Sequence, residues 1–149
     1  YLYQNWSSLS IMAVSIGAWF SMLSFSVDPL ERCLLVSPVL DMENLIQHMM
    51  EWASVTEDEL QTKGEIQTGF GQTLSWEYLC YVRKHPIKQW DKRTEILYAD
   101  GDRLISREGI DLFARTHHCG LSVMQDGEHW FHTPEQLRFL LEWERSKIR

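Results

Sequence analysis

The sequence predicts an α/β fold built on a mostly parallel sheet with flanking helices, and three observations support this prediction. Short apolar runs recur along the 149 residues, helical patterns alternate with these runs, and a helical pattern follows the last run. Strands that alternate with helices are typical of parallel sheets. Hydrophobic residues make up 44% of the chain, which is enough for one globular core.

Four short apolar runs are the predicted strands. The first, residues 9–14, is apolar without alternation, which is typical of a strand buried on both faces of a parallel sheet. The other three predicted strands are residues 32–37, 94–99 and 121–125.

Helices are predicted after the first, third and fourth of these strands. The apolar residues that follow Gly17 fall at helical spacings until an Asp-Pro pair at residues 28–29 stops the pattern. Further helical patterns cover residues 108–117 and 134–147, and the second begins with a proline, which suits a first helical turn. In that second pattern a helical spacing is shown by Leu137, Leu140 and Leu141.

A longer segment, residues 41–92, separates the second and third predicted strands and is too long for a simple crossover. It is rich in aromatic residues and methionine, and we expect a helical insertion that acts as a lid. Its expected elements are helices over residues 42–54 and 74–83, a capping-box helix start at Thr56 and a flexible loop over residues 64–71. The expected organisation is therefore residues 1–40, the lid of residues 41–92, and residues 93–149.

The charge and the cysteines argue against several classes of function. The chain has 14 Lys and Arg against 21 Asp and Glu, so its formal net charge is -7 and it has no general attraction to nucleic acid or anionic lipid. Its three cysteines are widely spaced without a Cys-x-x-Cys pair, which indicates neither a disulfide framework nor a zinc site. We expect reduced thiols and, by default, a cytoplasmic location.

Residues 1–27 contain no charge and raise the question of a membrane or targeting segment. A signal peptide needs a basic start, yet the first basic residue is Arg32. Several serines interrupt the run between residues 10 and 26, unlike a membrane-spanning helix. We therefore expect neither a signal peptide nor contact with a membrane.

The pentapeptide Ala13-Val14-Ser15-Ile16-Gly17 lies where the first predicted strand passes into a helix. A serine in a sharp strand-to-helix turn exposes its hydroxyl above the sheet, and the usual pattern is Gly-x-Ser-x-Gly, with small residues where the strand and helix backbones nearly touch. Here alanine replaces the first glycine. Small residues in such a turn also serve plain packing, so the pentapeptide alone leaves a catalytic and a structural interpretation open.

Two later turns favour the catalytic interpretation. The third strand ends in Asp100-Gly101-Asp102, and the fourth leads through Asp126-Gly127-Glu128 to His129. A serine, an acid and a histidine in this chain order, each after a strand, resemble the α/β-hydrolase superfamily. The resemblance covers essentially all 149 residues.

The resemblance implies a role for each of these residues. Ser15 would be the nucleophile, Asp102 the carboxylate that orients the imidazole, and His129 the general base and then the general acid. The backbone N–H of Ile16 would be one oxyanion donor. The implied reaction is acyl transfer to water through an acyl-enzyme, which requires no cofactor.

Neighbouring residues offer alternatives to this assignment. Asp100 lies two residues before Asp102, and His132 lies three residues after His129, so either could take the place of its neighbour. Residues 128–132 read Glu-His-Trp-Phe-His, but the glutamate lies outside the histidine pair, unlike the His-Glu-x-x-His zinc helix. We therefore expect no metal site.

The predicted lid and its start give the only indications of substrate. Its aromatic residues, Trp76 and Trp90 among them, predict an apolar pocket, although they could equally pack onto the body of the protein. Asp41 follows the second strand near the edge where ligands bind to open parallel sheets, and it either contacts substrate or caps the next helix. We expect small carboxylic esters or thioesters as substrates.

The fold that the chain resembles has a larger sheet, of which this sequence supplies about half. We therefore expect the chain to be the C-terminal part of a longer protein, whose preceding segment supplies the other strands and a second oxyanion donor. Two other functions stay open: an acyltransferase that uses the same triad, and a protein of this fold that binds a ligand or a partner without turnover.

Overall fold

The computed structural model describes residues 2–148 of the chain. The chain forms two compact units, unit 1 with residues 1–40 and 87–149, and unit 2 with Asp41–Pro86. The predicted insertion extended to residue 92, but residues 87–92 belong to unit 1, where Trp90 is buried in the core. The insertion therefore ends earlier than its aromatic composition indicated.

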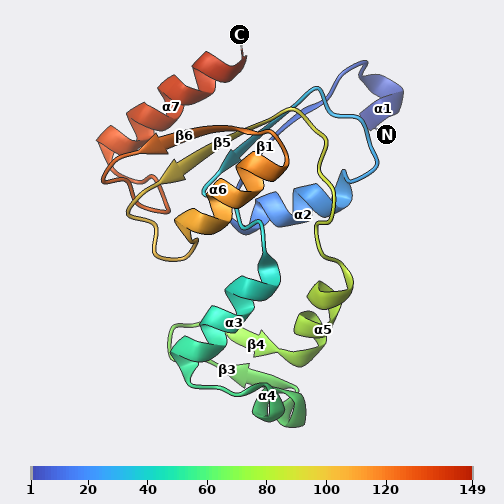
Figure 1. Cartoon of the computed structure of the whole chain (residues 1–149), viewed down its shortest axis with the longest axis vertical. Coiled ribbons are helices and arrows are strands. Elements are labelled where there is room, and N and C mark those ends of the chain that lie inside the picture. Colours follow the sequence, from blue (N-terminus) through green and yellow to red (C-terminus); the bar gives the residue numbers. More distant parts are fainter. Residues whose placement is uncertain (1, 149) are drawn as a thin grey trace. The chain divides into compact units, whose positions relative to one another are not determined.

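Unit 1 contains a four-stranded sheet in which all neighbouring strands are parallel (Figure 1). The strands form at the four predicted apolar runs, and their order in the sheet is β1 (Ser10–Val14), β2 (Arg32–Val36), β5 (Thr94–Ala99) and β6 (Gly120–Met124). This arrangement confirms the predicted α/β class. Because the strands are parallel, their carboxyl ends meet at one edge of the sheet.

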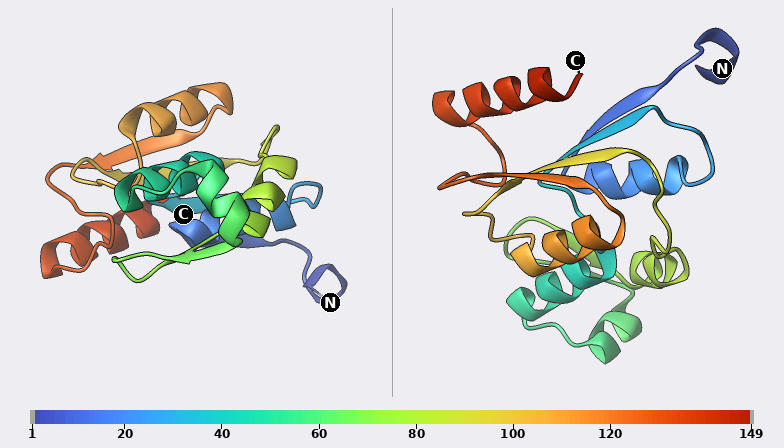
Figure 2. Two further views of the ribbon diagram at one scale, coloured as in Figure 1. Left: turned by 90° about the horizontal axis from the view of Figure 1, so that it is seen from below. Right: turned by 45° about the horizontal axis from the view of Figure 1, so that its top comes forward.

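Helices cover both faces of this sheet. The helices α2 (Ile16–Ser24) and α6 (Arg107–Thr116) lie on one face, and α7 (Pro134–Ile148) lies on the other (Figures 1 and 2). These three helices match the patterns found in the sequence. The short helix α1 (Leu2–Asn5) does not, because four residues without an apolar periodicity give no signal.

Two hydrophobic clusters hold the helices to the sheet, one on each face. Side chains alternate across a strand, so Leu35 of β2 faces the side of α2 and α6, whereas Leu34 faces α7. Trp19 on α2 and Trp143 on α7 are both buried. The core of unit 1 therefore supports the sheet from both sides.

The edge strand β1 corrects the expectation that both of its faces are buried. Ala13 is buried on the α2 side, but the Met12 and Val14 side chains on the opposite face are 42% and 45% exposed. An edge strand has only one neighbouring strand, and α7 packs on β5. The unbroken apolar run thus predicted the strand correctly. It did not predict that the described residues bury only one of the strand's two faces.

The buried face of α7 includes only part of the leucine pattern seen in the sequence. Leu137 and Leu141 are 46% and 50% exposed, whereas Gln136 and Trp143 are buried. Leu140 packs against the core on this face of the sheet. The spacing of the leucines therefore predicted the helix correctly, but Leu137 and Leu141 lie outside its buried face, in which Gln136 takes one of the inward positions.

Unit 2 consists of three helices and a two-stranded antiparallel sheet: α3 (Met42–Ala53), α4 (Glu57–Lys63), β3 (Glu65–Gln67), β4 (Thr73–Ser75) and α5 (Trp76–Lys84). As predicted, α4 begins at a cap, in which the Thr56 hydroxyl accepts a hydrogen bond from the Glu59 N–H at 3.2 Å. The loop predicted over residues 64–71 instead contains β3. It forms a strand because Ile66 pairs with Leu74 of β4, whose side chain is buried.

One arginine joins the three helices of unit 2. The Nε of Arg83, on α5, donates to Glu43 of α3 at 2.7 Å, and its two Nη atoms donate to the Glu57 carboxylate of α4 at 2.6 and 2.8 Å. Planar, bidentate pairs of this kind fix geometry as well as charge. The hydrogen bonds from Arg83 lower the pKa of Glu57.

Candidate active site

Ser15 lies directly after β1, at the carboxyl edge of the sheet, and precedes the first residue of α2. Its backbone has φ 53° and ψ -126°, a conformation that residues other than glycine rarely adopt. The Ser15 N–H donates to the Val36 carbonyl at 2.9 Å, and the Ser15 carbonyl accepts from the Val39 N–H at 3.0 Å. These two bonds to the end of β2 and the chain beyond it hold the strained turn.

Two expectations concern the residues that follow Ser15: close packing at Gly17 and an oxyanion donor at Ile16. A Cβ built on Gly17 would meet no atom within 4 Å, so the described residues do not require a glycine there for close packing. Ile16 is the first residue of α2, and a helix offers no internal acceptor to its first N–H groups. The Ile16 N–H is therefore available as a donor beside the Ser15 hydroxyl.

Asp102 follows β5 and has a side chain with 0% exposure. One carboxylate oxygen, Oδ1, accepts hydrogen bonds from the backbone N–H groups of Leu104 at 2.8 Å and Ile105 at 3.1 Å. These bonds fix the orientation of the carboxylate and direct Oδ2 toward His129, 2.6 Å from its Nδ1. Asp100, the alternative acid, is exposed instead.

His129 connects the serine and the aspartate. Its side chain is 5% exposed, its Nδ1 lies 2.6 Å from Asp102 Oδ2, and its Nε2 lies 2.8 Å from Ser15 Oγ. Both distances are those of hydrogen bonds. When Nδ1–H donates to the carboxylate, Nε2 is left to accept the serine proton. The alternative histidine, His132, is 62% exposed and faces Glu128 at 3.4 Å.

Two glycines bring the loops of Asp102 and His129 together. The Gly101 N–H donates to the Gly127 carbonyl at 3.0 Å, and a Cβ on Gly101 would lie 2.6 Å from that oxygen. A Cβ on Gly127 would lie 3.1 Å from side chains of β5 and β6. Both glycines are visible in the sequence as turn signals, but their contact is not, because it joins segments that are distant along the chain.

A buried glutamine holds the turn that contains His129. The Phe131 N–H donates to the Glu128 carbonyl at 3.1 Å, which closes this turn. The Gln136 side chain, on α7, accepts from the His132 N–H at 3.0 Å and donates to the Glu128 carboxylate at 3.3 Å. Gln136 thus binds the chain on both sides of His129. No pattern in the sequence pointed to this residue.

The three residues that the sequence assigned to substrate binding have different surroundings in the structure. Trp90 is buried in the core, and its Nε1 donates to Thr94 Oγ1 at 2.7 Å, at the amino end of β5 and so at the other edge of the sheet from Ser15. This position corrects its assignment to substrate binding. Asp41 caps α3 by accepting from the Asn44 N–H at 3.0 Å, which was the alternative expected for it. Trp76 is half-buried at the start of α5, and its role in binding stays a prediction.

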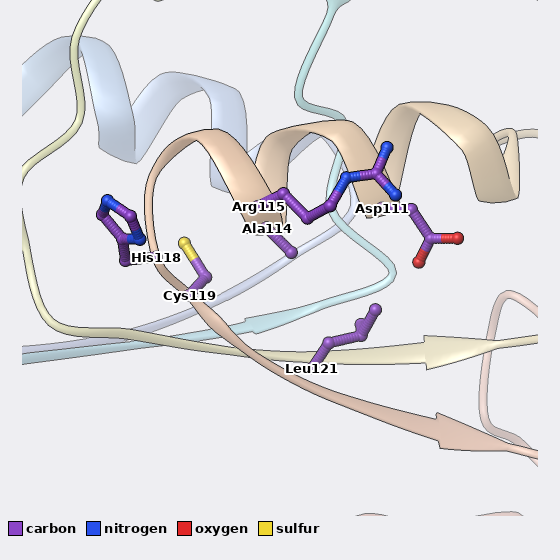
Figure 3. A pocket seen from close by; sticks show the side chains of 6 residues that line it. All are labelled: Asp111, Ala114, Arg115, His118, Cys119 and Leu121. Atoms are coloured by element: carbon purple, nitrogen blue, oxygen red, sulfur yellow. The ribbon is translucent and has the colours of Figure 1, made fainter.

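A cavity of about 420 Å³ lies between α6 and the amino end of β6, and it is lined by Asp111, Ala114, Arg115, His118, Cys119 and Leu121 (Figure 3). Burial raises the pKa of the Cys119 thiol to about 11, so the thiol is protonated at neutral pH and is a poor nucleophile. None of the three residues Ser15, Asp102 and His129 lines this cavity. It is therefore separate from the candidate active site.

Residues 2–148 offer neither a metal site nor a membrane-spanning helix. No group of three or more His, Cys, Asp and Glu side chains in this part of the chain is arranged to hold a metal ion. No helix within the same residues has the length and apolar character needed to cross a membrane.

Comparison with known proteins found similarity at the level of structure. No family model and no curated protein matches the sequence. A protein from Agrobacterium vitis S4 provisionally assigned as a hydrolase superposes with a TM-score of 0.71 at 16% identity, over 94% of this chain and 61% of that chain. Est1E from Butyrivibrio proteoclasticus, solved with bound ferulic acid, has a TM-score of 0.70 at 18% identity, over 91% of this chain and 59% of that chain.

A third solved structure is described as an α/β hydrolase. MGS-MChE2, an α/β hydrolase from the metagenome of lagoon sediments at Mar Chica, Morocco, has a TM-score of 0.57 at 12% identity, over 99% of this chain and 65% of that chain. The chain therefore has the α/β-hydrolase fold, with its mostly parallel sheet and flanking helices. It spans about 60% of the length of the first two solved chains.

Proposed function

We propose that the protein is a serine hydrolase that cleaves small carboxylic esters or thioesters through an acyl-enzyme on Ser15. One observation supports this most strongly, the continuous contact from Ser15 Oγ to His129 Nε2 at 2.8 Å and from His129 Nδ1 to Asp102 Oδ2 at 2.6 Å. A hydroxyl, a base and a buried carboxylate in this order are what nucleophilic catalysis by serine requires.

The first half of the proposed reaction forms the acyl-enzyme. Ser15 Oγ attacks the carbonyl carbon of the substrate while His129 Nε2 takes its proton, and the Asp102 carboxylate stabilises the imidazolium. The Ile16 N–H donates to the oxygen on which negative charge develops. The bond from the acyl carbon to the leaving oxygen or sulfur then breaks, and His129 returns the proton to the leaving group.

The second half releases the acid. His129 takes a proton from water, the resulting hydroxide attacks the acyl carbon, and the proton passes to Ser15 Oγ as the acyl bond breaks. No cofactor enters either half. Est1E, one of the structurally similar proteins, was solved with ferulic acid, and that carboxylic acid is the type of product that this reaction forms.

We also propose that β1 pairs with a strand from a preceding segment of the same protein. β1 is an edge strand whose Met12 and Val14 side chains are substantially exposed, and exposed apolar edges promote association. The same segment would supply the second oxyanion donor that this fold takes from an earlier loop. Residues 1–149 expressed alone should therefore self-associate, whereas a monomer that melts cooperatively would contradict this pairing.

We propose that the protein is located in a reducing compartment, by default the cytoplasm. Cys33, Cys80 and Cys119 are all free thiols. Proteins in oxidising compartments more often form disulfides. Fractionation of cells that express the tagged full-length protein tests this location.

Labelling with a fluorophosphonate tests the proposed activity, since this reagent modifies activated serines. The full-length protein and its Ser15→Ala variant are treated with the probe, and the modified residue is found by mass spectrometry. We expect modification at Ser15 and at least a hundredfold slower labelling in a His129→Ala variant. Labelling at another serine, or an unchanged rate without His129, would contradict the proposal.

A further inference from the structure

Trp130 is a large apolar residue that lies outside the core and beside the candidate active site. Its side chain is 68% exposed. Its ring centroid is 5.1 Å from that of the His129 imidazole, and the two ring planes meet at 84°, in an edge contact. Trp130 thus combines a free aromatic surface with direct contact to the histidine that binds Ser15.

The local backbone explains why Trp130 points outward. His129 and Trp130 are the two central residues of the turn that the bond from the Phe131 N–H to the Glu128 carbonyl closes. Phe131 is 3% exposed and has φ 44°, an uncommon backbone conformation for a bulky residue. With His129 and Phe131 both buried, the intervening side chain faces solvent. The indole is therefore held on a closed turn.

The proposed reaction indicates which part of the substrate the Trp130 side chain contacts. His129 Nε2 must protonate the leaving oxygen as the bond to the acyl carbon breaks, so the leaving group has to lie against the imidazole. After that step the alcohol departs and only the acyl group remains on Ser15. An exposed side chain in contact with the imidazole can therefore contact the alcohol portion of an ester during acylation, but not during deacylation.

We infer that Trp130 binds the alcohol portion of the substrate and favours esters whose leaving group is a neutral aromatic ring. This inference rests on the proposed serine hydrolase function. An indole offers a broad apolar surface, and aromatic pairs gain from both buried area and ring contact. Ile16, which follows Ser15 in the chain, is 45% exposed and adds apolar surface beside the serine.

Acetate esters separate the leaving group from the rest of the reaction, because all of them form the same acetyl-enzyme. The values of kcat/KM for 2-naphthyl acetate, ethyl acetate and acetylcholine are compared in the full-length wild-type protein and in Trp130→Ala and Trp130→Phe variants. Trp6→Ala is the matched control, since Trp6 is 61% exposed and lies before the amino end of β1. Deacylation is followed from the decay of the acetyl-enzyme.

We expect Trp130→Ala to lower kcat/KM for 2-naphthyl acetate by about tenfold, the effect of losing one aromatic contact and its buried area. Trp130→Phe should retain most of the activity, and ethyl acetate should change less than about twofold, within the range of a surface substitution. The deacylation rate and the Trp6→Ala variant should match the wild type.

Three outcomes would overturn the inference. Equal losses for naphthyl and ethyl acetate would mean that Trp130 only supports the position of His129. A larger loss for acetylcholine than for the naphthyl ester would assign the ring to a cationic leaving group instead. No hydrolysis of any ester, together with no fluorophosphonate labelling of Ser15, would overturn the proposed function and this inference with it.

Discussion

The backbone N–H of Gly101 donates to the carbonyl of Gly127 at 3.0 Å, and this bond joins the loop of Asp102 to the loop of His129. A methyl group on Gly101 would lie 2.6 Å from the Gly127 oxygen, closer than any real contact allows. Gly101→Ala should therefore separate the two loops and lower kcat/KM for an ester by on the order of a hundredfold, as small displacements in active sites do.

Gly69→Ala is the control for this change. Gly69 lies in unit 2, and a Cβ there would meet no atom within 4 Å. Its activity should equal that of the wild type. If Gly101→Ala retained full ester hydrolysis, the close contact of the two glycines would not matter for the geometry of the site.

Gln136 should position His129 without touching substrate. Gln136→Leu removes the partners of the His132 N–H and the Glu128 carboxylate, which should destabilise the fold by about 1–3 kcal/mol. At a temperature well below melting we expect kcat for ethyl acetate, whose leaving group does not depend on Trp130, to fall while KM stays unchanged, because the base moves and the other substrate contacts do not. A variant that melts earlier but keeps its kcat would show a structural role alone.

Asp102→Asn should remove catalysis while the fold is kept. The amide oxygen can still accept from the Leu104 and Ile105 N–H groups, but its NH₂ group would face His129 Nδ1 and impose the wrong tautomer. We expect kcat to fall by about 10⁴-fold, as for this change in other triads. The matched variant Asp100→Asn, two residues away and exposed, should keep the wild-type kcat, and the reverse result would make Asp100 the acid.

The pair of Arg83 and Glu57 should make the stability of the protein depend on pH. Hydrogen bonds from Arg83 lower the pKa of Glu57 below 4.5, its value when unperturbed. A carboxyl group whose pKa is lower in the folded state stabilises the fold above its unfolded pKa, and this stabilisation is lost as the pH falls through the folded pKa.

Arg83→Met should accordingly lower the melting temperature at about pH 7, and the difference from the wild type should shrink at about pH 3. Thermal melting followed by circular dichroism at both pH values measures this. Arg115→Met, at an exposed arginine of α6, controls for the loss of a positive charge. A difference of equal size at the two pH values would mean that Glu57 is not the group that matters.

Much of the fold could be predicted from local sequence patterns. Runs of apolar residues identified all four strands of the main sheet, because strands in parallel sheets are buried and rarely interrupted by charge. Burial within elements was harder to predict. The exposed Met12 depends on which segments pack beside β1, and the buried Gln136 depends on partners in another loop, so neither follows from periodicity.

Part of the candidate site could also be predicted from local sequence patterns. The order of Ser15, Asp102 and His129 along the chain is visible in the sequence, and the structure brings these three side chains within hydrogen-bond distance. Trp90 was misassigned because a core tryptophan and a substrate-binding one look alike until a partner such as Thr94 is seen. The turn of Glu128–Phe131, in which the Trp130 side chain faces solvent, is closed by one backbone hydrogen bond. No residue type in the sequence predicts that bond.

Trapping of the acyl-enzyme is the most direct test of Ser15 as the nucleophile. The full-length protein is mixed with 4-nitrophenyl acetate, quenched with acid within the first turnover, digested and examined by mass spectrometry, with Ser15→Ala in parallel. We predict one acetyl group on the peptide that contains Ser15, formed as fast as nitrophenol is released, and none in the variant. Equal turnover by the Ser15→Ala variant, or turnover without an acetylated Ser15, would exclude Ser15 as the nucleophile.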